Sequence, residues 1–218
     1  MAIQVQGFDG TVAAVDGTNY RALRTTLRPI DYGALGTYRL SLLSGTMAAG
    51  LAANSEVFQF RWSDATRLCV ITSIIWDGLS GSATAFAAGF GKVDVLVARS
   101  WTADGSGGSA ATITGNNQKM RTSMGTTLLG AARISSTAAL TAGTKTLDSH
   151  AIAQYSAAFG TATSTQWIPM VDLFHADAGS ESPLILAQNE GFVIRATVPA
   201  TGTWQFGCTV AWTEVTAF

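Results

Sequence analysis

The sequence predicts an all-β protein in which two antiparallel sheets pack as a sandwich. The stretch TWQFGCTVAW, residues 203–212, places Trp204, Trp212 and other bulky residues at every second position, with small or polar residues between them. Such alternation buries one face of a strand and leaves the other for water or close approach. Apolar runs of strand length recur along the chain, whereas helical patterns are short and weak. Strands are expected at 37–43, 56–62, 66–76, 92–102, 183–198 and 203–216.

The chain length favours one main domain. A chain of 218 residues can form a single β-sandwich, because all-β domains of this size commonly remain undivided. We expect residues 34–218 to form this domain and residues 1–33 to form an N-terminal arm. The arm has little bulk to pack against its own domain, so we expect it to lie on a neighbouring molecule.

Residues 19–29 (NYRALRTTLRP) carry the best helical pattern, a short helix that Pro29 must end. Arg21, Arg24 and Arg28 recur along it and are the candidate partner-binding residues. Guanidinium groups donate charge-assisted hydrogen bonds to acidic surfaces or phosphates. The alternative is an ordinary solvated helix face, with Asp31 close enough to pair locally.

Alternation also assigns faces within the middle strands. In 56–62, Phe58, Phe60 and Trp62 fall on one face, which we expect to be buried. The same pattern in 92–102 predicts a second apolar face. Its expected members are Val93, Val95, Val97 and Trp101.

The last two expected strands are joined by a short turn, VPATGT, that contains Pro199 and Gly202. A short connection of this kind between two alternating runs predicts an antiparallel hairpin. Within the preceding run, Asn189 to Gly191 mark a tight turn or a bulge.

Two long segments, 102–119 and 135–165, are rich in Gly, Ser, Thr and Ala and contain few bulky residues. We expect them to be long loops. In an assembling protein such loops can be ordered by the neighbour that they cover.

Composition narrows the possible environments and partners. Charged residues make up 12% of the chain and the formal net charge is −1, which argues against direct nucleic-acid binding. No uninterrupted apolar run reaches the roughly 18 residues of a membrane span, and MAIQVQGFDG does not resemble a secretory signal. Cys69 and Cys208 lie in apolar runs and are expected to be buried free thiols.

The sequence gives no catalytic constellation, so we expect a protein that is not an enzyme and uses no metal or cofactor. His175 lies near Asp172 and Asp177, but the cluster lacks the ligand spacing of a zinc site, and a polar strand end is the simpler interpretation. The stretches GLSGS (78–82), GFGKVD (89–94) and DGSGGS (104–109) each miss the nucleophile, phosphate-loop or calcium-loop pattern that they approach.

The tryptophans allow two interpretations. Six indole rings could line a glycan-binding cleft or a stacking platform for bases. Most of them fall at strand ends or on alternating apolar faces, which favours burial in a core or an interface.

The segment order resembles that of virion structural proteins of tailed bacteriophages. The likeness begins near residue 37 and covers most of the chain. The stretches that carry it are ANSEVFQFRWSDATRLCVITSI (53–74), AFAAGFGKVDVLVARSWTADGSGGSAATITGNNQKMRTSMGTTL (85–128), ARISSTAALTAGTKTLD (132–148) and PLILAQNEGFVIRATVPATGTWQFGCTVAWTEV (183–215).

The resemblance implies a jelly-roll sandwich and a non-enzymatic role as a capsid cement or decoration protein. Its expected partners are the major capsid protein and further copies of itself, as a dimer or trimer, on the capsid surface of a virion assembled in the host cytoplasm. Two alternatives remain: a tail, neck or fibre component, and a carbohydrate-binding β-sandwich used for host attachment.

Overall fold

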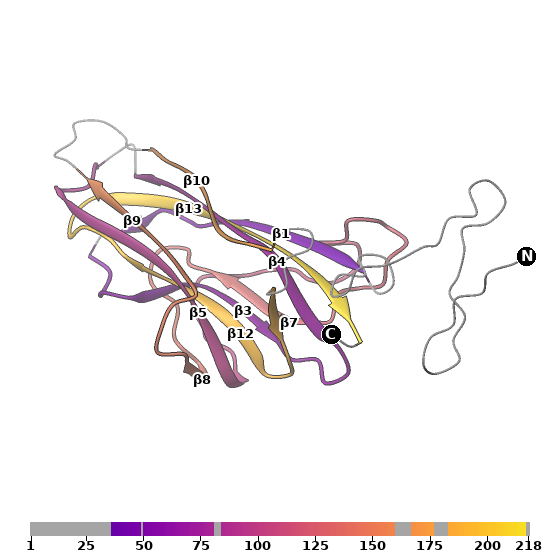
Figure 1. The fold of residues 1–218 in the computed structure, drawn as a ribbon. Helices are drawn as coiled ribbons and strands as arrows, with labels where there is room; N and C mark the ends of the chain where they lie inside the picture. The colour runs from indigo at the N-terminus through magenta and orange to yellow at the C-terminus, as the bar shows by residue number, and fades with distance from the viewer. Residues whose placement is uncertain (1–35, 49, 81–83, 160–166, 177–182, 217–218) are drawn as a thin grey trace, which may run out of the picture.

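The predicted fold class is confirmed by a computed structural model of the chain, in which two antiparallel sheets pack face to face (Figure 1). The structure describes residues 36–48, 50–80, 84–159, 167–176 and 183–216. The described residues contain strands and loops but no helix. The predicted arm, its helix at 19–29 and Arg21, Arg24 and Arg28 lie outside them.

Thirteen strands are present among the described residues. In chain order they are β1 (Thr37–Leu43), β2 (Met47–Ala48), β3 (Ser55–Trp62), β4 (Leu68–Ser80), β5 (Gly89–Ala103), β6 (Ser109–Ala110), β7 (Leu129–Ile134), β8 (Thr144–Leu147), β9 (Ala153–Phe159), β10 (Trp167–His175), β11 (Leu184–Leu186), β12 (Glu190–Thr197) and β13 (Thr203–Val215).

The strands divide into a six-stranded and a seven-stranded sheet. The six-stranded sheet has the order β1-β13-β4-β10, with β2 continuing beside β13 and β11 beside β4. The seven-stranded sheet has the order β6-β7-β3-β12-β5-β8, with β9 also beside β5. Because β8 pairs with the end of β5 and β9 with its beginning, these two strands form one edge in succession.

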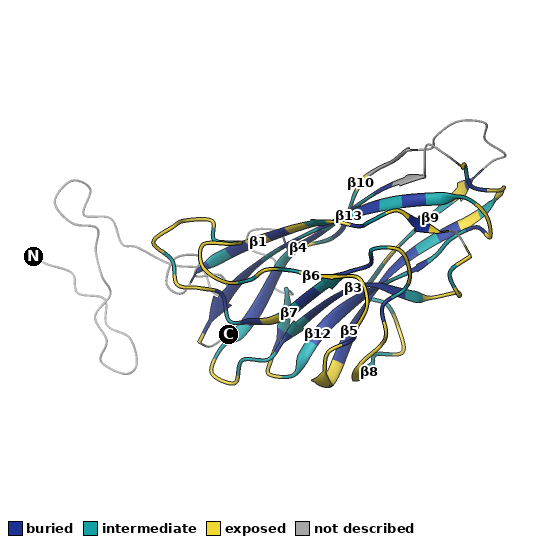
Figure 2. Ribbon diagram, turned by 180° about the vertical axis from the view of Figure 1, so that it is seen from behind, coloured by how far each residue is buried: buried dark blue, intermediate teal, exposed yellow. Residues whose placement is uncertain are grey.

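The core lies between the sheets and is dominated by aromatic rings. The bulky face of β13 points into it: Trp212 stacks on Tyr38 at 5.6 Å between ring centroids and meets the edge of Phe60 at 5.2 Å. At the other end, Phe206 stacks on Trp76 at 4.4 Å. Offset and edge-to-face contacts of this kind stabilise aromatic cores beyond their buried area. The alternation in residues 203–212 is therefore a packing pattern (Figure 2).

The hairpin predicted at VPATGT is wrong. β12 lies in the seven-stranded sheet and β13 in the six-stranded sheet, so residues 198–202 carry the chain from one sheet to the other. Pro199 and Gly202 indicate a turn, but they do not determine which strands pair on either side of it. β12 pairs with β3 and β5, and β13 pairs with β1 and β4. The apolar faces of the two strands therefore oppose each other across the core.

The single strand predicted at 183–198 is two strands in different sheets. β11 pairs with β4, and the turn before β12 contains Asn189 with a positive φ of 60°. The turn expected near Asn189 is therefore confirmed, and it marks the point where the chain changes sheet.

The face assigned to Trp101 is also wrong. Val93 and Val95 lie in the core, but Trp101 packs in a second cluster on the outer side of the seven-stranded sheet. The register of β5 shifts between Arg99 and Ala103, and Ser100 has a φ of 50°. One extra residue at this bulge turns every following side chain to the other face.

The segment 135–165 is not one long loop, because it contains β8 and β9. β9 has small residues at most positions, and its alternate members Ala153, Tyr155 and Ala157 pack partly buried against the core. Cys69 and Cys208 are buried free thiols as predicted, and burial raises the pKa of both.

Candidate partner-binding face

Around the second half of β5, the outer side of the seven-stranded sheet is covered by the chain itself. Leu96, Ala98, Trp101 and Val193 form a buried cluster there, and Leu147 of β8 and Ala151 pack against it. Gly191 is required beneath the indole, because a Cβ at this position would lie 2.8 Å from the Trp101 ring. The segment that carries β8 therefore packs on its own sheet.

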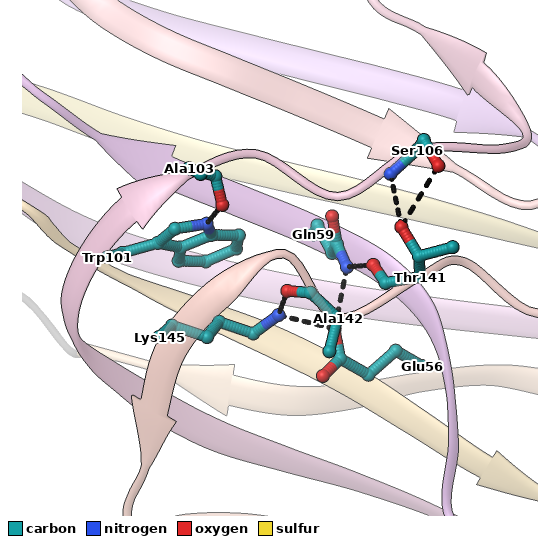
Figure 3. A network of polar contacts seen from close by, with 8 residues as sticks. All are labelled: Glu56, Gln59, Trp101, Ala103, Ser106, Thr141, Ala142 and Lys145. Carbon is teal, nitrogen blue, oxygen red and sulfur yellow. Dashed lines mark hydrogen bonds and ion pairs between the residues drawn. The ribbon is translucent and has the colours of Figure 1, made fainter.

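A buried ion pair fastens this covering segment. The Lys145 side chain is 2% exposed and its Nζ lies 2.8 Å from Oε2 of Glu56, which is also buried. The same Nζ donates to the Ala142 carbonyl and stands 4.5 Å from the centre of the Trp101 ring (Figure 3). Gln59 Nε2 donates to the same Glu56 oxygen and to the Thr141 carbonyl. A desolvated charge network of this kind holds only with its partners in place.

Further charges on this side are also paired within the chain. Asp94 accepts two hydrogen bonds from Arg195, at 2.9 and 3.0 Å, and lies 2.8 Å from Lys92 Nζ. Although burial opposes its ionisation, these partners hold the pKa of Asp94 below its usual value. Arg61 pairs with Asp104, and Arg99 with Asp148 and Glu190. Arg61 and Arg99 hold the loop residues Asp104 and Asp148 to the sheet, whereas Asp94 and Arg195 join the neighbouring strands β5 and β12.

These contacts assign structural roles to charged residues in the two stretches that approach a phosphate-loop and a calcium-loop pattern. Lys92 of GFGKVD pairs with Asp94, two residues along the same strand, and Asp104 of DGSGGS pairs with Arg61 of β3. Both residues have structural roles. The sequence could not reveal the partners Lys145 and Glu56, which are 89 residues apart.

The outer side of the six-stranded sheet is different. β13, one of its two inner strands, presents Gly207, Thr209 and Ala211 outward, opposite the core-facing aromatic residues. β1 adds Leu43, Ser41 and Arg39 on one flank in register with them. On the other flank, β4 adds Asp77, Ile75 and Ser73 in the same three rows. We call these nine residues, together with Met170, Asp172 and His175 of β10, the bare face.

A shallow trough runs across the bare face. Leu43 and Met170 line its two sides and are 68% and 70% exposed, although both are large and apolar. Gly207 forms part of its floor, where a Cβ would lie 2.1 Å from Asp77 Oδ1. Exposed apolar side chains around a shallow, small-residue centre are typical of a surface that another protein covers.

Seven of the twelve residues of the bare face are polar or charged, and they are distributed over all four strands. Thr209 Oγ1 donates to Ser41 Oγ at 3.0 Å, and His175 Nδ1 lies 3.4 Å from Asp172 Oδ2 with both side chains about half exposed. Asp177, the third member of the predicted polar cluster, lies outside the described residues. Across the described ranges, no group of three or more His, Cys, Asp or Glu residues could hold a metal ion.

The tryptophans do not form a binding platform where their side chains are described. Trp62, Trp76, Trp101, Trp204 and Trp212 are all buried. A cavity of about 30 Å³ lies at one end of the core, lined by apolar residues that include Trp76, Trp204 and Phe86. Pockets for small ligands usually enclose about 300 to 1,000 Å³, so this one is a packing defect.

No protein-family model, curated protein or solved structure matches this chain. In the part of the chain that the structure describes, no helix is long and apolar enough to cross a membrane.

Proposed function

We propose that the protein is a non-enzymatic virion structural protein, a capsid cement or decoration protein that stabilises contacts between neighbouring capsomers. The observation that carries the proposal is the difference between the two outer sides of the sandwich. On one side, the chain's own loops and ion pairs close the region around Trp101, although Phe90 of the same sheet is 80% exposed. On the other side, the bare face keeps both Leu43 and Met170 in solvent. A folded domain that exposes large apolar side chains on one face can bury them against another protein during assembly.

The order of the strands supports a jelly roll. Counting β8 and β9 as one strand and leaving aside the two- and three-residue strands and β7, eight strands remain. Numbered in chain order, they follow 1-8-3-6 in the six-stranded sheet and 2-7-4-5 in the other. This is the order expected of a jelly roll, a sandwich common in viral capsid proteins. A fold of this kind supports the proposal but does not define a function.

In this proposal the partners are the major capsid protein and further copies of the chain. Residues 1–33 extend to the capsid or to a neighbouring copy, and Arg21, Arg24 and Arg28 donate to an acidic surface there.

The test is the location and effect of the protein in particles. Purified virions from the genome that encodes it should contain copies on the order of hundreds, and particles without it should lose resistance to heat or osmotic shock. A few dozen copies, placed on the tail in a difference map, would favour a tail, neck or fibre component. Unchanged particle stability would reject the cement role.

Deletion of residues 1–33 tests the arm separately. The shortened chain should keep a cooperative β-rich fold but bind bare capsids more weakly, with less dependence on salt. Replacement of Arg21, Arg24 and Arg28 by Gln keeps the chain length and tests the charges alone. Unfolding of the shortened chain would assign the segment to the core, and equal binding would reject the arm.

A further inference from the structure

We propose that the bare face joins two copies of this chain in a face-to-face dimer whose two-fold axis runs close to the direction of β13. The inference rests on the proposed structural role, because it assigns one partner of that role to a defined surface. It concerns self-association alone and makes no statement about the capsid contact.

The centre of the bare face allows two sheets to approach closely. Gly207, Thr209 and Ala211 lie on β13, one of the two inner strands, and carry small side chains. Sheets pack about 10 Å apart when ordinary side chains interdigitate, and small residues reduce the distance that flanking groups must bridge. The longer side chains of Leu43 and Met170 flank this centre, where they can reach across to the second copy.

An axis parallel to β13 and midway between β13 and β4 makes the flanks complementary. Because the strand order is β1-β13-β4-β10, rotation about this axis keeps each row at its height and places β1 of one copy opposite β10 of the other. It also places β13 opposite β4, so Asp77 faces Gly207 of the partner subunit. Leu43 then faces Met170 of the partner subunit, an apolar contact that the symmetry repeats. Arg39 faces the pair formed by His175 and Asp172 of the partner subunit, whose nearest nitrogen and oxygen are 3.4 Å apart. The guanidinium gains a carboxylate, and this contact also occurs twice.

An axis across the strands gives a poorer match. It would reverse the order of the rows and place each strand opposite its own copy. Leu43 would then face Arg39 of the partner subunit, and Asp172 would face Asp172 of the partner subunit. An apolar side chain against a charge, and two like charges in opposition, disfavour this arrangement.

The size of the face suggests a reversible dimer. The rows of the bare face span about 14 Å along the strands and its four strands span about 15 Å across, so with its side chains the face offers on the order of 400 Å² per copy. The total of roughly 800 Å² is below the size of standard specific interfaces and falls in the range of weak, transient ones. We therefore expect association that depends on protein concentration.

Sedimentation equilibrium of the full chain tests the interface with Thr209→Arg, which places a long cation at the centre of the bare face. The wild type should associate to a dimer as its concentration rises from micromolar to millimolar, and the variant should weaken association by more than about tenfold. Ser156→Arg is the matched control, because Ser156 is an exposed small residue on β9 of the other sheet and should leave association unchanged. Melting curves establish that both variants are folded.

A charge exchange tests the direction of the axis. Arg39→Asp and Asp172→Arg should each weaken the dimer about tenfold, and the double variant should recover most of the loss because the two charges then meet with exchanged signs. If the double variant is as weak as either single variant, the axis along β13 is wrong. A wild type that stays monomeric, or a Thr209→Arg variant that associates like the wild type, overturns the whole inference. Capsid binding by such a monomer would leave the cement role standing, whereas a dimer that binds no capsid would reject only that role.

Discussion

The two outer sides of this sandwich differ in how their charged side chains are paired and where these side chains lie. On the seven-stranded sheet, Lys145, Arg99 and Arg61 pair with groups of the same chain and hold loops to the sheet near a buried apolar cluster, and Asp94 pairs with Arg195 of the next strand. On the six-stranded sheet, the bare face carries Arg39 and the pair of Asp172 and His175 on its outer strands. Asp77 lies beside Gly207 on the inner strands, next to the small residues of β13. Both sheets share one aromatic core, so the difference does not arise from the need to fold.

The two surfaces differ in the free-energy cost that each carries. Covering a sheet with a long segment orders many residues, at an entropic cost that buried contacts must offset. On the outer side of the seven-stranded sheet (the covered side), the apolar cluster around Trp101 and the ion pair between Lys145 and Glu56 offset this entropic cost. The bare face avoids the cost and leaves Leu43 and Met170 in water, a disadvantage that association would remove.

The largest expected effect tests the core that both sides share. Trp204 is buried among Trp76, Phe86 and Phe206. Trp204→Ala should lower the free energy of unfolding by about 4 kcal/mol, since it removes a large ring and leaves a cavity. Chemical denaturation measures the change.

Phe90→Ala is the control for this substitution. Phe90 is 80% exposed, so loss of its ring should change the free energy of unfolding by less than about 0.5 kcal/mol. Equal effects of the two variants would mean that the indole face of β13 is not the core.

The second-largest expected effect tests the ion pair between Lys145 and Glu56, which fastens the covering segment to the seven-stranded sheet. Lys145→Ala should cost about 3 kcal/mol, because it leaves the Glu56 carboxylate buried without its cation. Hydrogen exchange should rise in residues 135–148 before it rises in β3 or β12. The double variant Lys145→Met with Glu56→Gln removes both charges together and should recover much of the loss. If the double variant is no more stable than Lys145→Ala, the ion pair does not fasten the segment by charge.

The sequence predicted the strands that carry large apolar residues, because alternation reports burial directly. It missed β8 and β9, whose residues are mostly small or polar, and it placed Trp101 on the wrong face because a bulge at Ser100 has no reliable sequence signal. The sheet change after β12 was also missed, since a turn motif does not identify the sheet of the next strand. The small residues between the aromatic positions of β13 did predict a surface for water or close approach.

A third prediction concerns Glu214, a buried carboxylate at the end of β13 that accepts hydrogen bonds from Thr127 Oγ1 and the Leu128 amide. Burial raises the pKa of Glu214, although these hydrogen bonds oppose the shift. The folded state therefore binds the proton more tightly than the unfolded state does. This contribution to stability is present at low pH and is lost as pH rises from about 4.3, the usual value for Glu, through the raised pKa.

Glu214→Gln removes the titration and keeps an oxygen for both donors. The stability of the variant relative to the wild type should increase as pH rises from about 4 to about 7. Urea denaturation at several pH values measures this difference. A constant difference across the range would show that Glu214 has the same pKa in both states.

The smallest expected effect comes from one kind of substitution, Thr to Val, made once on each outer side of the sandwich. Thr209→Val on the bare face removes one exposed hydrogen bond, to Ser41, and keeps a β-branched residue in its strand, so the monomer should change by less than about 0.5 kcal/mol. Thr141→Val on the covered side removes the hydroxyl that accepts from the Ser106 amide at 2.6 Å and contacts Ser106 Oγ at 3.0 Å, and it should cost about 1 kcal/mol. Denaturation at a concentration too low for association compares the two. A larger loss at Thr209 than at Thr141 would mean that the bare face is held together by its own polar contacts, and the distinction between the two sides would fail.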